Sequence, residues 1–345
     1  MTDAELASFV SSLPKVELHV HLEGAMRPAL LLALACRRGV SLPASDETGL
    51  AEFFRFRDFE HFVEVYLLCS KCLRDPEDFQ LLVEDFLGEQ ERQNVRYTEA
   101  HLTISTHLAN GANGGEIADA LRESIRRAEK ERGIGLRLIA DIVRNVPYER
   151  ADQTVEWALA HREGLVVALG MSGKEESPCD PFRSHFAAAE QEGLGRVAHA
   201  GEQTSAADVK RVLEACRPQR IGHGIRAVED PELLDELVRR RLPLEVSPTS
   251  NVRLGNADSY DAHPLATLYS RGVPLSINTD DPAFFGTTLV EEYLHAARML
   301  DLEPQGVAGL ARAAVGHSFL PATAQAEIES EIDREAARAL EALGE

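Results

Sequence analysis

The chain lacks the features that mark membrane, secreted and nucleic-acid-binding proteins. Its longest apolar run, residues 29–36, is far too short to cross a bilayer, which takes about 20 residues. The first residues show no basic segment followed by an apolar one, so no secretory signal is expected. Basic residues number 36 against 57 acidic ones, and the net charge of −21 would be repelled by nucleic-acid backbones and anionic membranes. We expect a cytoplasmic protein that binds a small molecule and has no nucleic-acid or membrane partner.

Cysteine is also scarce. The chain has five cysteines, an odd number scattered over 345 residues, which does not fit a disulfide framework and predicts a reducing compartment. Cys69 and Cys72 have the spacing C-x-x-C, but they lie in a segment with helical periodicity. Because no second cysteine pair accompanies them, we expect neither a redox nor a zinc role for this pair.

Several motifs of known enzyme classes are missing. The absence of H-E-x-x-H excludes the helical metalloprotease arrangement. The cytidine-type deaminase pattern, H-x-E with P-C-x-x-C, is also absent, since residues 177–182 contain a single cysteine. No G-x-x-x-x-G-K-[ST] and no strand-linked G-x-G-x-x-G occurs, which argues against nucleoside triphosphates and dinucleotide cofactors.

The chain does contain a regular alternation of β-rich and helical segments. From about residue 95 onward, short β-rich runs alternate with longer segments of helical periodicity, the pattern of a parallel sheet built from βα units. With one earlier strand the total is eight, the number that closes a (β/α)8 barrel. The predicted strands are 16–22, 95–102, 136–143, 165–170, 196–200, 220–223, 243–247 and 274–279. We therefore expect an α/β TIM-type barrel, with residues 1–345 forming a single domain.

Two helical additions to the barrel are predicted. The segment between the first and second strands, about residues 28–92, is long and holds several helices, so it would lie as an insertion at the mouth of the barrel and wall off a site there. The acidic, Ala-rich residues 326–345 predict a C-terminal helical extension. Among the connecting helices, Asp230 followed by Pro231 marks a helix start, and a helix from residue 115 ends near Gly133.

His19 and His21 are the most informative pair of residues. They stand two residues apart in the first predicted strand, so their side chains project to the same face. Zn²⁺ or a similar metal takes two such nitrogens at about 2.0–2.1 Å. The alternative is an exposed edge strand that carries two histidines by chance. The residues at the ends of the other predicted strands decide between a metal site and this alternative.

Polar residues stand at three further predicted strand ends, which is where a barrel places its catalytic groups. His199 and Glu202 follow the fifth strand, His223 follows the sixth, and Asp280 and Asp281 follow the eighth. Three imidazole nitrogens and one carboxylate, from His19, His21, His199 and Asp280, would hold Zn²⁺ and leave room for one water. Glu202 and His223 then serve as proton-transfer groups. This set predicts hydrolysis of a carbon–nitrogen or ester bond and leaves the substrate open.

With these residues in view, the chain resembles the adenosine deaminase family of metal-dependent amidohydrolase barrels. The resemblance runs from near residue 10 to about residue 330, with the motifs in the family's order. The motifs are the segments 14–24 (PKVELHVHLEG), 199–202 (HAGE), 220–224 (RIGHG), 247–251 (SPTSN) and 278–282 (NTDDP).

The resemblance implies one zinc ion per chain, with His19, His21, His199 and Asp280 as its ligands. It also implies that Glu202 protonates purine N1, that His223 assists the hydroxide that attacks C6, and that ammonia leaves. Asp281 would contact purine N7, and the backbone of Gly173 would contact N3.

Departures from the family pattern concern the substrate. Residues 171–175 read MSGKE where many members have LAGDE, Ser247 replaces a cysteine, and Glu23 stands where many members have the aspartate that contacts the sugar. Adenosine or 2′-deoxyadenosine is the first expectation. Residues 53–66 and 97–104 are as similar to the aminodeoxyfutalosine deaminases as to the adenosine enzymes, so aminodeoxyfutalosine is an alternative substrate. Adenine deaminases are a third, less similar branch.

Two other classes of function compete with this prediction. A binuclear amidohydrolase would need a carboxylated lysine on the fourth strand, where residues 166–170 have none and Lys174 falls in the loop beyond. A catalytically dead purine-binding protein would have lost its proton-transfer groups, whereas Glu202 and His223 are both present. The sequence leaves the oligomeric state and the motion of the insertion undetermined.

Overall fold

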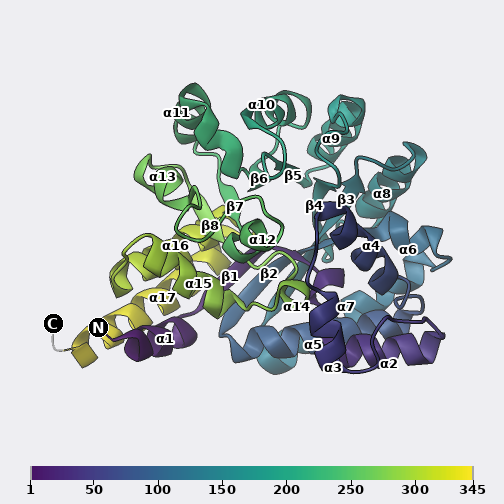
Figure 1. The fold of residues 1–345 in the computed structure, drawn as a ribbon, viewed down its shortest axis with the longest axis horizontal. Helices are drawn as coiled ribbons and strands as arrows, with labels where there is room; N and C mark the ends of the chain where they lie inside the picture. The colour runs from purple at the N-terminus through teal and green to yellow at the C-terminus, as the bar shows by residue number, and fades with distance from the viewer. Residues whose placement is uncertain (1, 344–345) are drawn as a thin grey trace.

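A closed parallel barrel forms the centre of the molecule (Figure 1). The computed structural model describes residues 2–343, and its eight strands pair in chain order, each parallel to the next. The strands are β1 Lys15–His21, β2 Val95–Leu102, β3 Gly135–Val143, β4 Val166–Ser172, β5 Gly195–Ala200, β6 Arg220–His223, β7 Leu244–Val246 and β8 Leu275–Ile277. The predicted TIM-type barrel is therefore confirmed. β4 continues two residues beyond the prediction because Met171 and Ser172 pair with β3.

Backbone hydrogen bonds join the first strand to the residues after the last one. His21 N donates to the Asp280 carbonyl at 2.7 Å, and Asp280 N donates to the His19 carbonyl at 3.1 Å. The amide of Leu18 donates to Oδ1 of Asn278 at 2.9 Å. The seam of the barrel thus runs through three of the predicted site residues.

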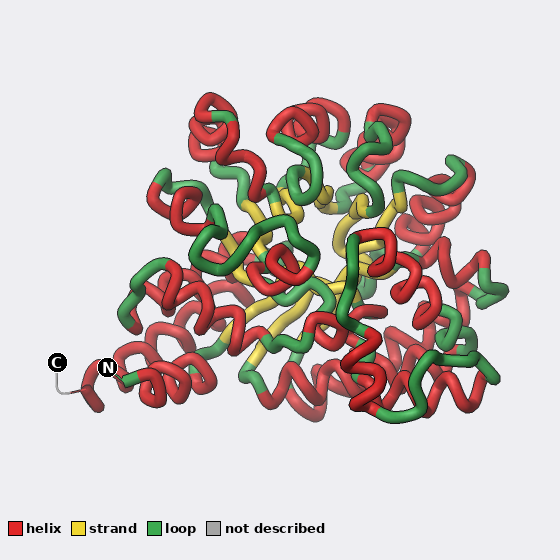
Figure 2. Tube along the Cα trace, viewed as in Figure 1, coloured by secondary structure: helices red, strands yellow, loops and turns green. Residues whose placement is uncertain are grey.

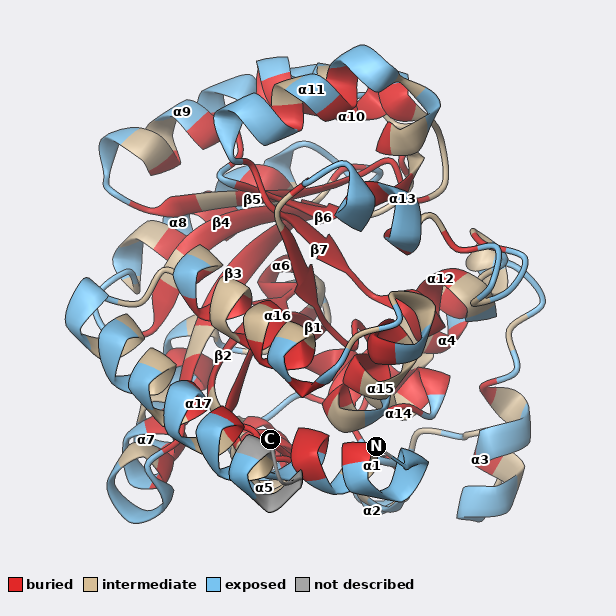
Figure 3. Ribbon diagram, turned by 90° about the vertical axis from the view of Figure 1, so that its left-hand side faces the viewer, coloured by how far each residue is buried: buried red, intermediate tan, exposed pale blue. Residues whose placement is uncertain are grey.

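Helices surround the barrel (Figure 2), and several of them bury one face while the opposite face is exposed (Figure 3). The helices are α1 Asp3–Ser12, α2 Pro28–Arg38, α3 Glu47–Phe53, α4 Phe59–Ser70, α5 Pro76–Arg92, α6 Ile104–Ala109, α7 Gly114–Arg132, α8 Glu149–Ala160, α9 Arg183–Gln191, α10 Ala206–Ala215, α11 Pro231–Arg240, α12 Pro248–Arg253, α13 Leu265–Ser270, α14 Pro282–Phe285, α15 Leu289–Met299, α16 Pro304–His317 and α17 Ala322–Leu343. In α11, Asp230 caps the amino end by accepting from Glu232 N and Leu233 N, as predicted. Its buried face carries Leu233, Leu234 and Leu237.

The segment between β1 and β2 contains α2 to α5. Of these, α4 lies over the mouth of the barrel, where Phe62 stacks at 5.6 Å between ring centroids on Phe285 of α14. Tyr66 of α4 lies edge-on to His21 at 6.3 Å. Helix α4 ends at Ser70, so Cys72 lies just outside it, and all five cysteines are free thiols. This segment therefore contributes aromatic side chains to the site below it.

The C-terminal part of the chain packs as two helices, α16 and α17. Helix α17 begins at Ala322, four residues before the predicted extension, and residues 344–345 lie outside the described part. Helix α16 packs against β1 and β8, the strands on either side of the seam. Within residues 2–343 no helix is both long and apolar enough to cross a membrane.

Candidate active site

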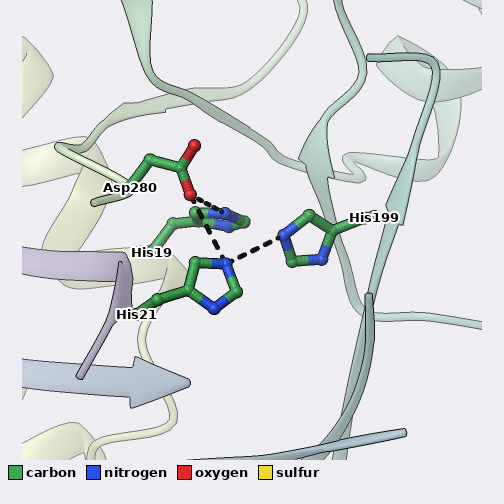
Figure 4. A group of neighbouring side chains, drawn as sticks. All are labelled: His19, His21, His199 and Asp280. Carbon is green, nitrogen blue, oxygen red and sulfur yellow. Dashed lines mark hydrogen bonds and ion pairs between the residues drawn. The ribbon is translucent and has the colours of Figure 1, made fainter. Parts of the chain in front are cut away.

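Four buried side chains meet at the carboxyl ends of the strands (Figure 4). His19 and His21 come from β1, His199 from β5, and Asp280 from the turn after β8. Nε2 of His21 lies 3.2 Å from Nε2 of His199 and 3.4 Å from Oδ1 of Asp280. Nε2 of His19 lies 3.5 Å from the same oxygen. The four offer one ligand atom each within 4.8 Å of one another, so the structure brings together all four predicted metal ligands.

Hydrogen bonds on the far side of His199 and Asp280 direct a lone pair of each toward this centre. His199 Nδ1 lies 2.9 Å from the Met171 carbonyl oxygen, which can only accept, so the ring donates there and Nε2 keeps its lone pair. Ser250 Oγ donates to Oδ2 of Asp280 at 2.6 Å and leaves Oδ1 facing the histidines. Nitrogen and carboxylate donors held in this way fit a divalent metal such as Zn²⁺.

The charge states of the cluster also suit a metal. Burial, with a contribution from His101, lowers the pKa of His21 to about 4. Burial and the neighbouring histidines lower the pKa of His199 well below its ordinary value. Although burial opposes it, the pKa of Asp280 is lowered by its hydrogen bond to His19 and by the nearby imidazoles. His21 and His199 are therefore neutral and Asp280 is ionised, the protonation states that metal binding requires, whereas His19 must give up its proton when a metal binds.

A buried ion network supports His19 from behind. Nδ1 of His19 lies 2.8 Å from Oε2 of Glu245 on β7, and Arg220 on β6 donates from Nε to Oε1 of the same carboxylate at 2.5 Å. Arg220 also pairs with Glu99 of β2 at 2.6 Å and stacks over the Phe319 ring at 4.1 Å. Burial alone would lower the pKa of His19, but its bonds to Asp280 and Glu245 raise it to about 10. The carboxylates of Glu245 and Asp280 thus place negative charge next to His19.

Sequence reasoning missed part of this arrangement. Glu245 and Glu99 are fully buried carboxylates, and an acidic residue within a predicted barrel strand is the signal that would have marked them. His101 and Asp141 form a second missed pair, joined by an Nδ1–Oδ1 contact of 2.9 Å, with the His101 ring 4.7 Å from that of His19.

Glu202 is placed to act as an acid. Burial, then the charges of Glu175 and Asp280, raise the pKa of Glu202 to about 8, so its carboxyl group is protonated at neutral pH. Its Oε1 accepts from Asn256 Nδ2 at 2.9 Å, and its backbone amide donates to Glu175 at 3.0 Å. A carboxyl group held neutral in a cavity can donate a proton to a bound ligand.

His223 lies next to Glu202 and next to the cluster. Its Nε2 is 3.8 Å from Oε2 of Glu202 and 3.9 Å from Oδ2 of Asp280. The side-chain amide of Asn251 donates to its Nδ1 at 3.2 Å, so the ring hydrogen resides on Nε2 and points at this space. Burial lowers the pKa of His223 to about 3, which keeps the ring neutral. The residue holds a left-handed φ of 60°, a strained conformation for a histidine.

Asp281 lies beside Asp280 and over Gly24. Its Oδ1 has no hydrogen-bond partner among residues 2–343, and burial together with Asp280 and Glu23 raises its pKa well above the ordinary value. The carboxyl group is therefore a hydrogen-bond donor. A Cβ on Gly24 would lie 1.7 Å from Oδ1, so glycine is required there for Asp281 to occupy this position.

Gly173 follows β4 and lines the cavity with its backbone. Its φ is 93°, and a Cβ there would lie 2.3 Å from Oδ1 of Asn145, so only glycine fits. The next residue, Lys174, extends away from the cluster and pairs with Glu60 at 2.7 Å. Because β4 itself contains no lysine, the structure offers no bridging residue for the binuclear alternative.

Glu23 is held behind the cavity. Its Oε1 accepts from Thr103 Oγ1 at 2.6 Å and lies 3.0 Å from Nε2 of His107. Burial raises the pKa of this carboxyl group, but the bonds from His107 and Thr103 prevail and lower it to about 2. Glu23 is not among the residues that line the cavity, so its contact with substrate stays a prediction.

One cavity of about 200 Å³ is lined by the metal-ligand candidates His21, His199 and Asp280 and by the proton-transfer candidates Glu202 and His223. Its reactive end holds His21, His199, Glu202, His223, Asp280 and Asp281. Side chains of α4, among them Phe59, Phe62 and Tyr66, form an aromatic wall. A larger hollow of about 510 Å³ between α3, α5 and α14 contains none of the predicted site residues, so the chemistry belongs to the smaller cavity.

Comparison with known proteins agrees with the resemblance to the adenosine deaminase family. A family model described as adenosine deaminase matches residues 14–335. An aminodeoxyfutalosine deaminase of Streptomyces avermitilis is 41% identical over 336 residues, which cover 96% of this chain and 94% of that protein. An adenine deaminase of Streptomyces coelicolor is 37% identical, covering 89% and 91%. The crystal structure of adenine deaminase from Arthrobacter aurescens matches with a TM-score of 0.88 at 29% identity, covering 93% and 98%.

Proposed function

This chain belongs to the adenosine deaminase family, hydrolases that act on carbon–nitrogen bonds of cyclic amidines, and we propose that it replaces the 6-amino group of a purine with oxygen and releases ammonia. The observation that carries the proposal is the buried cluster of three histidines and one aspartate, with the carboxyl group of Glu202 in the same cavity.

A divalent metal, for which zinc is our proposal at one ion per chain, would be held by His19, His21, His199 and Asp280. When bound, such an ion makes hydroxide available near neutral pH by lowering the pKa of water from 15.7 toward about 7. The donor set supports this proposal because the outward nitrogen of His199 and one oxygen of Asp280 are already engaged elsewhere.

The remaining residues bind the purine and move protons. Glu202 gives its proton to N1, which makes C6 more electrophilic and prepares it for attack. His223 donates from Nε2 to the attacking oxygen and so holds it on the side of the ring that faces the cluster. Asp281, also protonated, donates to the lone pair of N7, and the backbone of Gly173 contacts N3. The roles of Glu202, His223 and Asp281 match the protonation states that burial favours.

The substrate proposal differs in order from the sequence prediction, which placed adenosine first. The relatives support aminodeoxyfutalosine as the first candidate, because the Streptomyces avermitilis enzyme of that name is 41% identical over nearly the whole chain. Adenine is the second candidate, supported by the Streptomyces coelicolor relative and by the Arthrobacter aurescens structure. Adenosine and 2′-deoxyadenosine follow.

An ammonia-release assay tests the proposal. Purified protein, with its metal content measured, is given aminodeoxyfutalosine, adenine, adenosine and 2′-deoxyadenosine, and kcat/KM is compared between them. We expect ammonia from at least one of the four, with aminodeoxyfutalosine ranked first. Protein that carries one metal ion per chain and releases ammonia from none of them would contradict the proposal and favour the binding-protein alternative.

A further inference from the structure

One side chain that does not line the reactive cavity contacts the proposed acid. Asn256 is half-buried in the turn after α12, and its Nδ2 donates to Oε1 of Glu202 at 2.9 Å. Leu254, two residues earlier, lines the cavity, whereas Asn256 is not among the lining residues. The carboxamide therefore acts on the acid itself, and a bound purine would not touch it.

The second oxygen of Glu202 has a different environment. Its Oε2 lies 3.8 Å from Nε2 of His223, so this oxygen faces the other proton-transfer candidate. It also accepts from Nε2 of Gln203 at 3.1 Å, a longer contact than the one to Asn256. A carbonyl oxygen is a better acceptor than a hydroxyl oxygen, so the shorter bond marks Oε1 as the carbonyl oxygen. The proton of the acid is then left on Oε2.

Helix α12 fixes the turn that carries Asn256. The backbone amide of Asn256 donates to the carbonyl oxygen of Asn251 at 2.8 Å. The side chain of Asn251 in turn donates to Nδ1 of His223, and the preceding Ser250 donates to Asp280. One short segment thus holds three groups of the reactive centre in fixed positions relative to one another: the aspartate, the histidine and the acid.

The surroundings of Glu202 disfavour its ionised form. Burial comes first, and the negative charges of Glu175 and Asp280 add to it, so the pKa of Glu202 is raised. The titratable groups near its carboxyl group are Glu175, Asp280, His19 and His223. Once the proton has passed to a ligand, a buried carboxylate remains. Hydrogen bonds to an ionised acceptor are about twice as strong as those to a neutral one, so a donor on each oxygen stabilises that carboxylate.

We propose that Asn256 is a positioning residue of the reaction, which directs the proton of Glu202 onto Oε2 and stabilises the carboxylate that remains after N1 of the purine has taken that proton. This inference rests on the proposed function and deepens it. In the step, the O–H bond at Oε2 breaks, an N1–H bond forms, and the electron pair of the O–H bond stays on the carboxylate. Because the contact from Asn256 is stronger after this transfer than before it, the contact accelerates the step and does not tighten substrate binding.

Asn256→Leu removes the donor and keeps a side chain of similar size. With aminodeoxyfutalosine and with adenine as substrates, we expect kcat to fall about 10-fold and KM to stay unchanged, because the lost contact belongs to the ionised acid. The alkaline limb of the pH profile should move to higher pH, since the loss of a donor favours the protonated form. Asn256→Gln, which keeps a carboxamide, should recover part of kcat and bring the limb back toward that of the wild type.

The matched control is Asn110→Leu. Asn110 is half-buried at the carboxyl end of α6 and does not line the cavity, so kcat, KM and the alkaline limb should all stay as in the wild type. A lower kcat in Asn256→Leu with the limb in its wild-type position would show that Asn256 only maintains the structure, and would overturn the inference. Wild-type kinetics in Asn256→Leu would overturn it as well.

Infrared difference spectroscopy of the metal-loaded protein separates this inference from the proposed function, because it needs no turnover. The carbonyl stretch of the protonated acid is the band that Glu202→Gln removes. In Asn256→Leu this band should move to higher wavenumber, because its carbonyl oxygen no longer accepts a hydrogen bond from the carboxamide. If no compound releases ammonia, the proposed function fails, while this shift would still support the positioning of the acid by Asn256. A band that stays in place would reject it.

Discussion

The imidazole of His19 and the carboxylate of Glu245 are 2.8 Å apart, and both side chains are completely buried. The contact joins β1 to β7, and it determines which nitrogen of His19 faces the cluster. Arg220 holds the other oxygen of the same carboxylate, so the orientation of a metal ligand depends on a residue of β6.

Replacing Glu245 with Gln keeps the shape of this contact and removes its charge. We expect the metal affinity to fall about 10- to 100-fold, the usual effect of losing a carboxylate that orients a ligating histidine. Competition with a chelator of known affinity measures this directly. Glu176→Gln, at an exposed position, is the control, and an unchanged affinity in Glu245→Gln would show that the carboxylate does not support the metal site.

Glu202→Gln should lower kcat about 10²- to 10⁴-fold and leave the metal content intact, because a carboxamide cannot give up a proton to N1.

The activity should also depend on pH through Glu202, because only the protonated form of this carboxyl group can act as the acid. Since the pKa of Glu202 is raised to about 8, activity that depends on it is full below that pH and is lost as the pH rises through it. The pH profile of kcat/KM checks this, and an alkaline limb that stays near pH 8 in the variant would exclude Glu202 as its source.

Removing a proposed ligand should remove the metal. In Asp280→Ala and in His199→Ala we expect the metal content per chain to fall well below one, because three remaining donors leave the site incomplete. Elemental analysis of dialysed protein gives the number. His161→Ala, a histidine beyond the end of α8, should keep its metal, and full metal content in either ligand variant would show that the ligand set is wrong.

Gly24→Ala should impair catalysis without removing the metal. The new methyl group would lie 1.7 Å from Oδ1 of Asp281, so that carboxyl group must move away from its place at the purine. We expect kcat/KM to fall about 10²-fold, as for other displacements of a binding group by about 1 Å. Gly309→Ala in α16 is the control, since nothing lies within 4 Å of its Cβ position. Normal kinetics in Gly24→Ala would contradict the assigned role of Asp281.

Much of the fold was predictable because its signals are local. The alternation of strands and helices, and caps such as Asp230, are read within a few residues of sequence. Residues His19, His21, His199 and Asp280 were predicted to meet because a barrel gathers the carboxyl ends of its strands at one face. All four do lie together.

Other parts of the site depend on contacts that no local pattern encodes. Glu245 is 226 positions from His19, and their contact requires the faces of β1 and β7 to meet across the barrel. The sequence did not indicate what holds Glu23, whose Oε1 makes three hydrogen bonds with two residues after β2, Thr103 and His107.

The seam between β1 and the turn after β8 has a consequence for biosynthesis. His19 and Asp280 are joined through their backbones at 3.1 Å, although most of the chain separates them. A ribosome that has made β1 to β7 has therefore made three ligands but not the fourth. We expect the nascent protein to acquire its metal late, after the last strand has been released and the barrel has closed, so the reactive centre is among the last parts of the molecule to form.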